Sequence, residues 1–279
     1  MLRFIANTNL FIAFAALVLA LGSGLSLGTI GSILPFLLLL FFATVADYNW
    51  HRLMKVKLKI GSTDKNEWGN QHSSIIIVFA VMSTIALLIS IIYAPIEITE
   101  WLFLMAIVTF LYSFPFYKMG WQKLDIRQIP GLKNALIAFT WTIATLYLPY
   151  LLSDKTESSA SLALLITQRS VFFFAITIPF DIKDVDEDRA AGWKTIPVLF
   201  NKTIAQRMTN YLIVAMMLIS IVHLLIYRGN HEGFAAIITA VYTLIIVNQK
   251  SLKQHPLYYP IYMDGAILLF GLFLIAFSL

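Results

Sequence analysis

The chain has 279 residues, of which 59% are hydrophobic and only 13% are charged, and its formal net charge is +5. This composition excludes an ordinary soluble domain and is typical of a helical membrane protein with several spans. The sequence contains no cysteine, which excludes disulfides, thiol chemistry and zinc–thiolate sites. It also lacks a glycine-rich phosphate loop and any nucleic-acid-binding motif, so we expect no nucleic-acid partner.

Nine apolar segments follow one another, each close to the ~20 residues that cross a bilayer. No linker between them is long enough to mark a second domain, so we expect a single domain over residues 1–279. The sequence therefore predicts an all-α polytopic membrane protein with nine transmembrane helices. The predicted spans are 5–22, 28–47, 73–94, 98–115, 133–152, 161–180, 204–227, 233–249 and 259–278.

The basic residues predict how these spans are oriented. With nine spans, 17 of the 20 Lys and Arg fall on the side of the N-terminus. Positive residues are enriched in cytoplasmic loops, so this pattern predicts a cytoplasmic N-terminus. We expect the protein to lie in the inner (cytoplasmic) membrane. The long polar loops at 48–72, 116–132 and 181–203 lie on the same side, where we expect the functional residues.

An acidic stretch opens the third of these loops, directly after an apolar run. On a helix turning ~100° per residue, Asp181, Asp184 and Asp188 share a face within roughly 60°, while Asp186 and Glu187 point elsewhere. Carboxylates this close repel one another unless a cation lies between them, and Mg²⁺ prefers such oxygen ligands. The pattern fits either a Mg²⁺ and diphosphate site or an acidic, solvated turn between two membrane helices.

A second polar stretch follows the end of the second predicted span. Asp47, His51 and Lys55 recur every four residues and therefore share one face of a continuing helix. They fit a polar wall of the same site. The alternative is that Arg52 and Lys55 are ordinary topology signals beside interfacial aromatic residues.

Further charges lie between and within the spans. Lys118, Lys123, Arg127 and Lys133 follow the fourth span and suit either a phosphate group or anionic lipid heads. Arg169 and Asp264 fall inside predicted spans, where a charge is costly and marks either a functional site or a buried polar pair.

One longer motif gives the acidic stretch a family context. Asp181-x-x-Asp184-x-x-x-Asp188-Arg189-x-Ala191-Gly192-x-Lys194-Thr195-x-Pro197, together with nine spans, resembles the UbiA-type intramembrane prenyltransferase superfamily. The resemblance implies helices arranged around a central apolar cavity, and Mg²⁺ held by two Asp-rich motifs. It also implies an enzyme that transfers an isoprenyl group from a prenyl diphosphate to a lipophilic, often aromatic, acceptor. The expected partners are these two substrates and the membrane lipids.

The first Asp-rich motif of that family is altered in this chain. The family pattern Asn-x-x-x-Asp-x-x-x-Asp reads here as Asp47, His51 and Lys55, with Arg52 kept in its family place. A lysine cannot bind Mg²⁺, although it neutralises phosphate directly. Either a side-chain charge replaces one metal, or ionisation of the diphosphate has been lost.

The resemblance also assigns roles to individual residues. In the active enzyme, bound metal and basic side chains would stabilise the departing diphosphate, while aromatic faces would stabilise the allylic cation. Two alternatives remain: a homologue that binds an isoprenoid or quinone lipid without transfer, and a membrane transporter suggested by Arg169 and Asp264. The expected metal ligands are Asp181, Asp184 and Asp188, the other catalytic residues Asp47 and His51, the diphosphate-binding residues Lys194, Arg189, Lys118, Arg52 and Lys55, and the candidate aromatic residues Tyr112, Phe116 and Tyr117.

Overall fold

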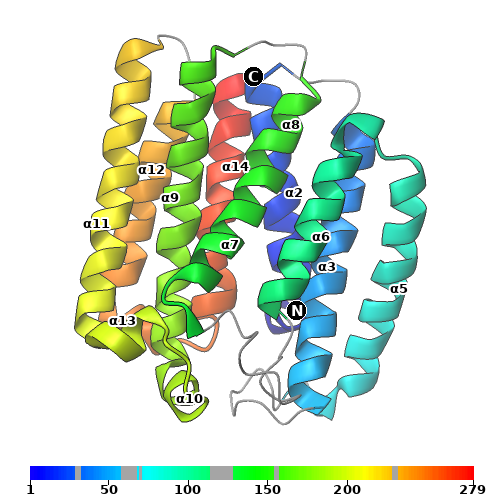
Figure 1. Ribbon diagram of the computed structural model, residues 1–279, viewed down its shortest axis with the longest axis vertical. Coiled ribbons are helices and arrows are strands. Elements are labelled where there is room, and N and C mark those ends of the chain that lie inside the picture. The colour runs from blue at the N-terminus through cyan, green and yellow to red at the C-terminus, as the bar shows by residue number, and fades with distance from the viewer. Residues whose placement is uncertain (29–32, 58–67, 69–70, 114–127, 154–156, 228–231) are drawn as a thin grey trace.

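A computed structural model describes residues 1–28, 33–57, 68, 71–113, 128–153, 157–227 and 232–279. Helices are the only regular secondary structure among these residues. Figure 1 shows them standing side by side along the long axis of the molecule. Their bounds are α1 Leu2–Asn7, α2 Leu10–Ser26, α3 Ile33–Lys57, α5 Ser73–Ile92, α6 Thr99–Ser113, α7 Leu132–Thr142, α8 Leu148–Leu151, α9 Ser159–Lys183, α10 Val185–Ala190, α11 Ile196–Ile226, α12 Glu232–Asn248, α13 Lys250–Lys253 and α14 Asp264–Ser278, with a short 3₁₀ turn at Ile96–Ile98 and π-helical turns at Ile143–Tyr147 and Tyr258–Met263.

Six stretches of helix in the described part of the chain are long and apolar enough to cross a membrane. The other three predicted spans contain shorter helices there, α2 and α12 with 17 residues each and α6 with 15. Seventeen helical residues extend ~25 Å, somewhat less than the ~30 Å hydrocarbon core. The nine-span count therefore stays a prediction. The six long stretches are Ile33–Met54, Ser73–Ile92, Leu132–Leu151, Ser159–Lys183, Ile196–Ile226 and Tyr258–Ser278.

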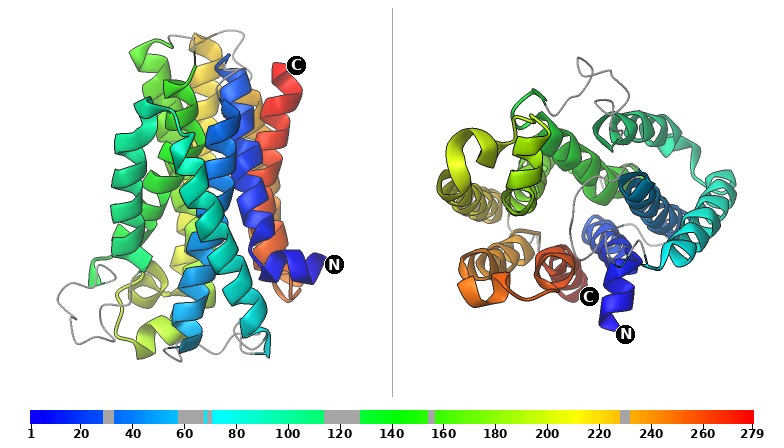
Figure 2. Two further views of the ribbon diagram at one scale, coloured as in Figure 1. Left: turned by 90° about the vertical axis from the view of Figure 1, so that its right-hand side faces the viewer. Right: turned by 90° about the horizontal axis from the view of Figure 1, so that it is seen from below.

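Neighbouring helices pack in an almost continuous series around the bundle. Contacts connect α7 with α9, α9 with α11, α11 with α12 and α12 with α14. The series continues from α14 through α2 and α3 to α5, while α6 packs against α7. The view from below in Figure 2 shows α9 and α3 on different sides of the bundle. The fold thus brings α2 and α14, which lie near the two ends of the chain, together, and places α9 apart from α3.

The contact between α2 and α14 depends on glycine. A Cβ atom added to Gly271 would lie 2.5 Å from the backbone nitrogen of Leu19, and one added to Gly22 would lie 2.6 Å from the carbonyl oxygen of Gly271. No side chain fits between backbones this close. Small residues at helix crossings are typical of membrane bundles, where close packing replaces the hydrophobic effect as the main source of association.

The helix α11 is interrupted near its start. Asn201 has φ 69° and ψ 164°, so it leaves the helical conformation within the run Ile196–Ile226. Its side-chain oxygen then accepts hydrogen bonds from the backbone N–H groups of Thr203 and Ile204, both 3.0 Å long. These bonds satisfy two donors that the first turn of a helix leaves free, so Asn201 acts as the N-cap of a second helical segment.

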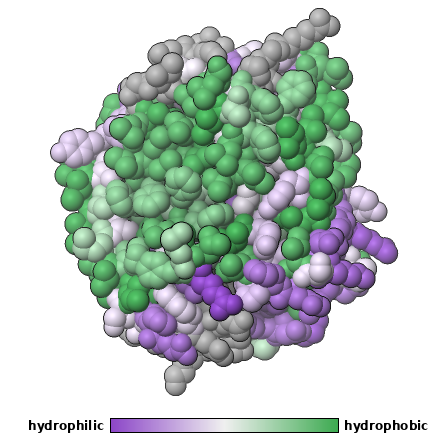
Figure 3. All heavy atoms as spheres, turned by 180° about the vertical axis from the view of Figure 1, so that it is seen from behind, coloured by the Kyte–Doolittle hydropathy of each residue, from purple (hydrophilic) through white to green (hydrophobic). Residues whose placement is uncertain are grey.

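The surface divides into an apolar belt and a polar end. Figure 3 shows apolar side chains over most of one face, while hydrophilic side chains gather at its lower end. The helices α10 and α13 lie at that same end in Figure 1. Large apolar side chains are exposed along α5, such as Met82, Leu88 and Ile92. Six apolar helices and this belt indicate an integral membrane protein.

Candidate functional site

The acidic stretch lies where α9 passes into α10. The helix does not run straight through it, because Asp184 leaves the helical conformation with φ −91° and ψ 9°. Backbone hydrogen bonds still bridge the break: Asp184 N–H donates to the Phe180 carbonyl at 3.1 Å, and Asp188 N–H donates to the Asp184 carbonyl at 2.9 Å. The predicted continuous helix is therefore bent at Asp184.

The five acidic side chains differ sharply in exposure. Asp181 and Asp188 are buried, and Asp184 is half-buried. Asp186 instead is 77% exposed and lies 3.5 Å from Lys202 and 3.7 Å from Arg189. The three aspartates of the motif thus face the protein more than Asp186 does.

Asp181 is neutralised by two residues at the start of α7. The ammonium group of Lys133 lies 2.7 Å from Oδ1, and the side-chain amide of Asn134 donates to Oδ2, also at 2.7 Å. Asn134 also donates to the hydroxyl of Thr177 at 2.9 Å, one turn before Asp181 on α9. Both oxygens of this buried carboxylate therefore already have partners.

Asp188 is less well compensated. Its Oδ2 atom is buried and has no hydrogen-bond partner among the described residues. Burial raises the pKa of Asp188 to about 6, Lys133 and the Thr195 hydroxyl oppose this rise, and the nearby Asp181 and Asp184 add to it. A carboxylate with a buried free oxygen, beside two others, is a position that favours binding of a cation.

The turn after α10 holds Asp188 in place. Gly192 has φ 73°, a left-handed conformation that glycine adopts without steric cost. Its N–H donates to the Arg189 carbonyl at 3.1 Å, and the next N–H, of Trp193, donates to the Asp188 carbonyl at 2.9 Å. This is the Schellman ending of a helix. The Ala-Gly pair of the motif thus supplies the turn that folds the buried Trp193 back beside Asp188.

The basic residues of the second motif lie at the surface. Lys194 is exposed, and so is Arg189. Neither is buried against the aspartates, and both lie at the polar end of the bundle, within reach of a soluble anion. Their predicted role in binding diphosphate stays a prediction.

The residues of the altered first motif lie on α3. Asp47 and His51 are half-buried. Arg52 is buried and donates to the backbone carbonyl of Asn7 and, at 3.3 Å, to Oδ1 of Asn9. These contacts join α3 to the break between α1 and α2. The guanidinium of Arg52 thus has a structural use, and its predicted binding of diphosphate stays untested.

Asn49 strengthens the same junction. It is fully buried, donates to the carbonyl of Thr8 at 3.0 Å, and accepts from the side-chain amide of Asn9 at 3.2 Å. Asn9 has φ 61°, so the backbone turns sharply there. Asp47 stands where the family motif has an asparagine. The neighbouring Asn49 instead holds the break between α1 and α2 through its hydrogen bonds with Thr8 and Asn9.

Several predicted residues cannot be placed. The side chain of Lys55 lies outside the described residues, although its backbone belongs to α3. The side chain of Tyr112 is likewise outside them. The same holds for Phe116, Tyr117, Lys118, Lys123 and Arg127.

The donor set of the acidic junction suits a hard divalent cation such as Mg²⁺, because carboxylate oxygens are its usual protein ligands. Within the described part of the chain, however, no three acidic or histidine side chains converge around one point. Both oxygens of Asp181 already have partners on α7. The carboxylates of Asp184 and Asp188 are chemically suited to such a cation, and Asp181 could offer Oδ1 to it only if Lys133 moved away.

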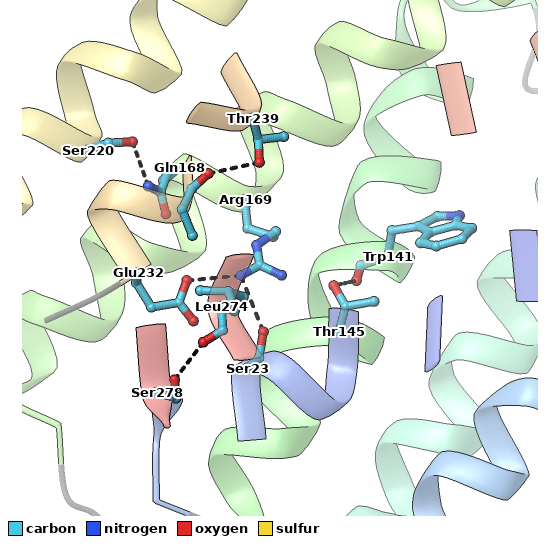
Figure 4. A network of polar contacts seen from close by, with 11 residues as sticks. Ser23, Trp141, Thr145, Gln168, Arg169, Ser220, Glu232, Thr239, Leu274 and Ser278 are labelled. Carbon is cyan, nitrogen blue, oxygen red and sulfur yellow. Dashed lines mark hydrogen bonds and ion pairs between the residues drawn. The ribbon is translucent and has the colours of Figure 1, made fainter. Parts of the chain in front are cut away.

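A second buried polar cluster lies on the other half of α9. Nη2 of Arg169 lies 3.0 Å from Oε2 of Glu232 and 3.2 Å from the hydroxyl of Ser23, as Figure 4 shows. The ring of Phe270 lies against the guanidinium, 4.2 Å from its carbon to the ring centroid. This cluster ties α9 to α12, α2 and α14, which gives Arg169 a structural explanation.

Three partners of the buried charges do not follow from the sequence patterns. Lys133 was grouped with the other cations after the fourth span, and Asn134 was not singled out. Glu232, the partner of Arg169, lies directly before the eighth predicted span, 233–249. A charge of opposite sign near a membrane span was the available signal, because an intramembrane charge needs a partner.

Comparison with known proteins places this geometry in a family. The model of the UbiA prenyltransferase family matches residues 71–256, which include α7, α9 and α10. No curated protein matches the chain.

Solved structures share the fold at low sequence identity. A UbiA homologue from Archaeoglobus fulgidus bound to GPP and Mg²⁺ has a TM-score of 0.67 and 15% identity, covering 98% of this chain and 99% of its own. The same homologue bound to DMAPP and Mg²⁺ gives 0.66 and 16%. An apo UbiA homologue from Aeropyrum pernix K1 gives 0.67 and 12%, covering 96% of this chain and 98% of its own. The fold is therefore shared over nearly the whole length, and the chain belongs to the UbiA prenyltransferase family.

Proposed function

We propose that this chain is a prenyltransferase that moves an isoprenyl group from a prenyl diphosphate to a lipophilic acceptor, with an aromatic compound as the first candidate. Family membership supports this proposal, and the Archaeoglobus fulgidus homologue of the same fold binds GPP or DMAPP together with Mg²⁺. The observation that carries it is the junction of α9 and α10. There Asp181, Asp184 and Asp188 lie at the polar end of an apolar bundle, and Lys133 pairs with Asp181.

The proposed roles follow from position. Bound Mg²⁺ would supply positive charge to the departing diphosphate, and Asp184 and Asp188 would hold it. Lys133 and Lys194 would bind phosphate oxygens directly, because an ammonium group is a compact positive charge. The prenyl carbon that loses diphosphate would then bond to the acceptor, which gives up a proton.

Aromatic rings lie at the same end of the bundle. Phe180, next to Asp181, packs against Tyr259 with ring centroids 5.2 Å apart, and the ammonium of Lys183 lies 5.0 Å from the Tyr259 ring centroid. The negative face of such a ring attracts cations. We propose that these rings help to stabilise the allylic cation, while an apolar cavity houses the prenyl chain and keeps water away.

We also propose nine spans, with the N-terminus and the acidic junction facing the cytoplasm. The absence of cysteine makes this directly testable, because single cysteines can be introduced without background. Lys194→Cys should react with an impermeant thiol reagent only in inverted vesicles, and Ile96→Cys only from the opposite side. Equal labelling of both from one side would contradict the proposed topology.

The proposed activity is tested by diphosphate release from geranyl or farnesyl diphosphate with Mg²⁺ and candidate aromatic acceptors. We expect release by the unaltered protein and its loss in Asp184→Ala and Asp188→Ala. Asp186→Ala is the matched control, since it removes an exposed acid from the same helix. Equal loss in all three variants would contradict the assigned roles.

Binding without transfer is the second candidate. Two features favour it: Lys133 occupies Asp181, and the first motif has His51 and Lys55 where the family has aspartates. Tight binding of a prenyl diphosphate without any release, with every acceptor class, would support it. One of the two charged residues that suggested a transporter, Arg169, is explained by its buried counter-ion Glu232. Substrate flux into liposomes without binding of prenyl diphosphate would restore that function.

A further inference from the structure

The contact between Lys133 and Asp181 joins two groups that the proposed reaction needs for other partners. The ammonium group lies 2.7 Å from the carboxylate, and Asp181 is 1% exposed while Lys133 is 26% exposed. The carboxylate is therefore fixed inside the protein, whereas the lysine reaches it from the polar end. A lysine side chain is long and flexible, so its ammonium group can move away while the carboxylate stays.

The same corner contains a buried oxygen that lacks a partner. Oδ2 of Asp188 finds no hydrogen-bond partner among the described residues, and Lys133 is a positive charge that acts on this carboxyl group. One lysine ammonium thus pairs with Asp181 and also acts on Asp188. A second positive charge would be attracted here, and it would meet Lys133 as a competitor for Asp181.

We propose that Lys133 is a built-in counter-ion that competes with a divalent cation for Asp181 and gives up that carboxylate when a diphosphate arrives. The proposal rests on the proposed function in one respect, since the diphosphate belongs to the prenyl substrate. In the ligand-free protein, Lys133 holds Asp181 and weakens metal binding. When a metal and a diphosphate enter together, Lys133 moves to a phosphate oxygen, and Asp181 becomes a metal ligand.

Asn134 explains why Asp181 does not move with the lysine. Its amide donates to Oδ2 of Asp181 at 2.7 Å and to Thr177 at 2.9 Å, so it is anchored on α9 at both contacts. The carboxylate stays oriented by Asn134 after Lys133 has left. One oxygen, Oδ1, is thereby freed for a metal.

The consequence is linked binding. If a metal and a diphosphate each relieve the same ion pair, each must increase the affinity for the other by the same factor. Without Lys133, the metal should bind tightly even when no diphosphate is present, and this linkage should weaken.

The experiment measures metal affinity rather than turnover. Mn²⁺ is titrated into the purified full-length protein in phosphatidylcholine nanodiscs, and free Mn²⁺ is followed by electron paramagnetic resonance. We expect Lys133→Met to tighten Mn²⁺ binding about tenfold, which corresponds to ~1.4 kcal/mol. Lys183→Met is the matched control, because Lys183 is two residues from Asp181 yet lies over the ring of Tyr259. It should change the affinity less than about twofold, as expected for an exposed charge.

A second background isolates the carboxylate. In Asp181→Asn protein, the Lys133→Met change should no longer affect Mn²⁺ affinity, because the two cations have nothing left to compete for. A nonhydrolysable geranyl thiolodiphosphate should tighten Mn²⁺ binding in the unaltered protein more than in Lys133→Met. Lys133→Gln, which keeps a hydrogen-bonding side chain, replaces Lys133→Met if that protein does not fold.

The proposal is overturned if Lys133→Met and Lys183→Met change the affinity equally, if the effect survives in Asp181→Asn, or if the variant binds no Mn²⁺. None of these outcomes depends on transfer activity. A protein that shows the competition and never releases diphosphate would uphold this inference and refute the proposed reaction. A protein that releases diphosphate but shows no competition between Lys133 and Mn²⁺ would refute this inference and uphold the proposed reaction.

Discussion

The guanidinium of Arg169 and the carboxylate of Glu232 lie 3.0 Å apart, and neither side chain has any exposed surface. Removing one partner leaves a buried charge uncompensated, which costs about 3–5 kcal/mol. We therefore expect Glu232→Ala to lower the unfolding temperature in detergent strongly. The double change Arg169→Met and Glu232→Leu should recover most of the loss, because it removes both charges.

The control for this pair is an ion pair at the surface. Lys202 lies 3.5 Å from Asp186, and both side chains are more than half exposed. Lys202→Ala should shift the stability by less than about 0.5 kcal/mol. If Glu232→Ala were as mild as Lys202→Ala, the structural role assigned to Arg169 would be wrong.

Asp188 should make stability depend on pH. Burial raises its pKa from 3.8 to about 6, so the folded protein holds this proton more tightly than the unfolded chain does. The contribution of Asp188 to the free energy of unfolding is therefore greatest below pH ~4 and decreases as the pH rises towards about 6. In metal-free buffer, Asp188→Asn should be more stable than the unaltered protein at pH 8, and the difference should vanish near pH 4.

Thermal unfolding at both pH values, with a chelator present, checks this expectation. Asp186→Asn serves as the comparison, because that side chain is 77% exposed. If the difference in unfolding temperature between Asp188→Asn and the unaltered protein did not depend on pH, burial would not raise the pKa of Asp188.

The crossing of α2 and α14 should not tolerate a methyl group. A Cβ atom at Gly271 would lie 2.5 Å from backbone atoms of Leu19, which cannot move aside as a side chain can. We expect Gly271→Ala to cost about 1–3 kcal/mol through overpacking. Gly265→Ala, on the same helix, should be tolerated, since its nearest neighbour would be the Tyr242 hydroxyl at 3.5 Å. Similar unfolding temperatures for the two variants would contradict the close crossing.

Arg52 allows a separation of structural and substrate-binding roles. Its guanidinium binds Asn7 and Asn9 at the break between α1 and α2. Arg52→Met should therefore lower the unfolding temperature, while Mn²⁺ affinity at the acidic junction stays within about twofold of the unaltered value. A large loss of prenyl diphosphate affinity in a variant of unchanged stability would instead support the family role.

The helical character and the acidic junction could be predicted from local sequence, because apolar runs and three-residue and four-residue spacings are local patterns. The partners of the charged residues could not. Lys133 lies 48 residues before Asp181, and Glu232 lies 63 residues after Arg169. Such pairs depend on which helices become neighbours. The spacing of the aspartates predicts a regular helix through the motif and gives no sign of the bend at Asp184.

The break at Asn201 has a consequence for how the protein responds to its lipid surroundings. A membrane helix tilts when the bilayer becomes thinner or thicker, and a continuous α11 would carry that tilt through to Ile196 at its start. Because the chain restarts its helix at Asn201, the short segment ahead of it is joined to the rest of α11 through one non-helical residue. A tilt of the segment after Asn201 therefore need not move residues 196–200, whereas Asp181 lies on α9 and follows the tilt of its own span.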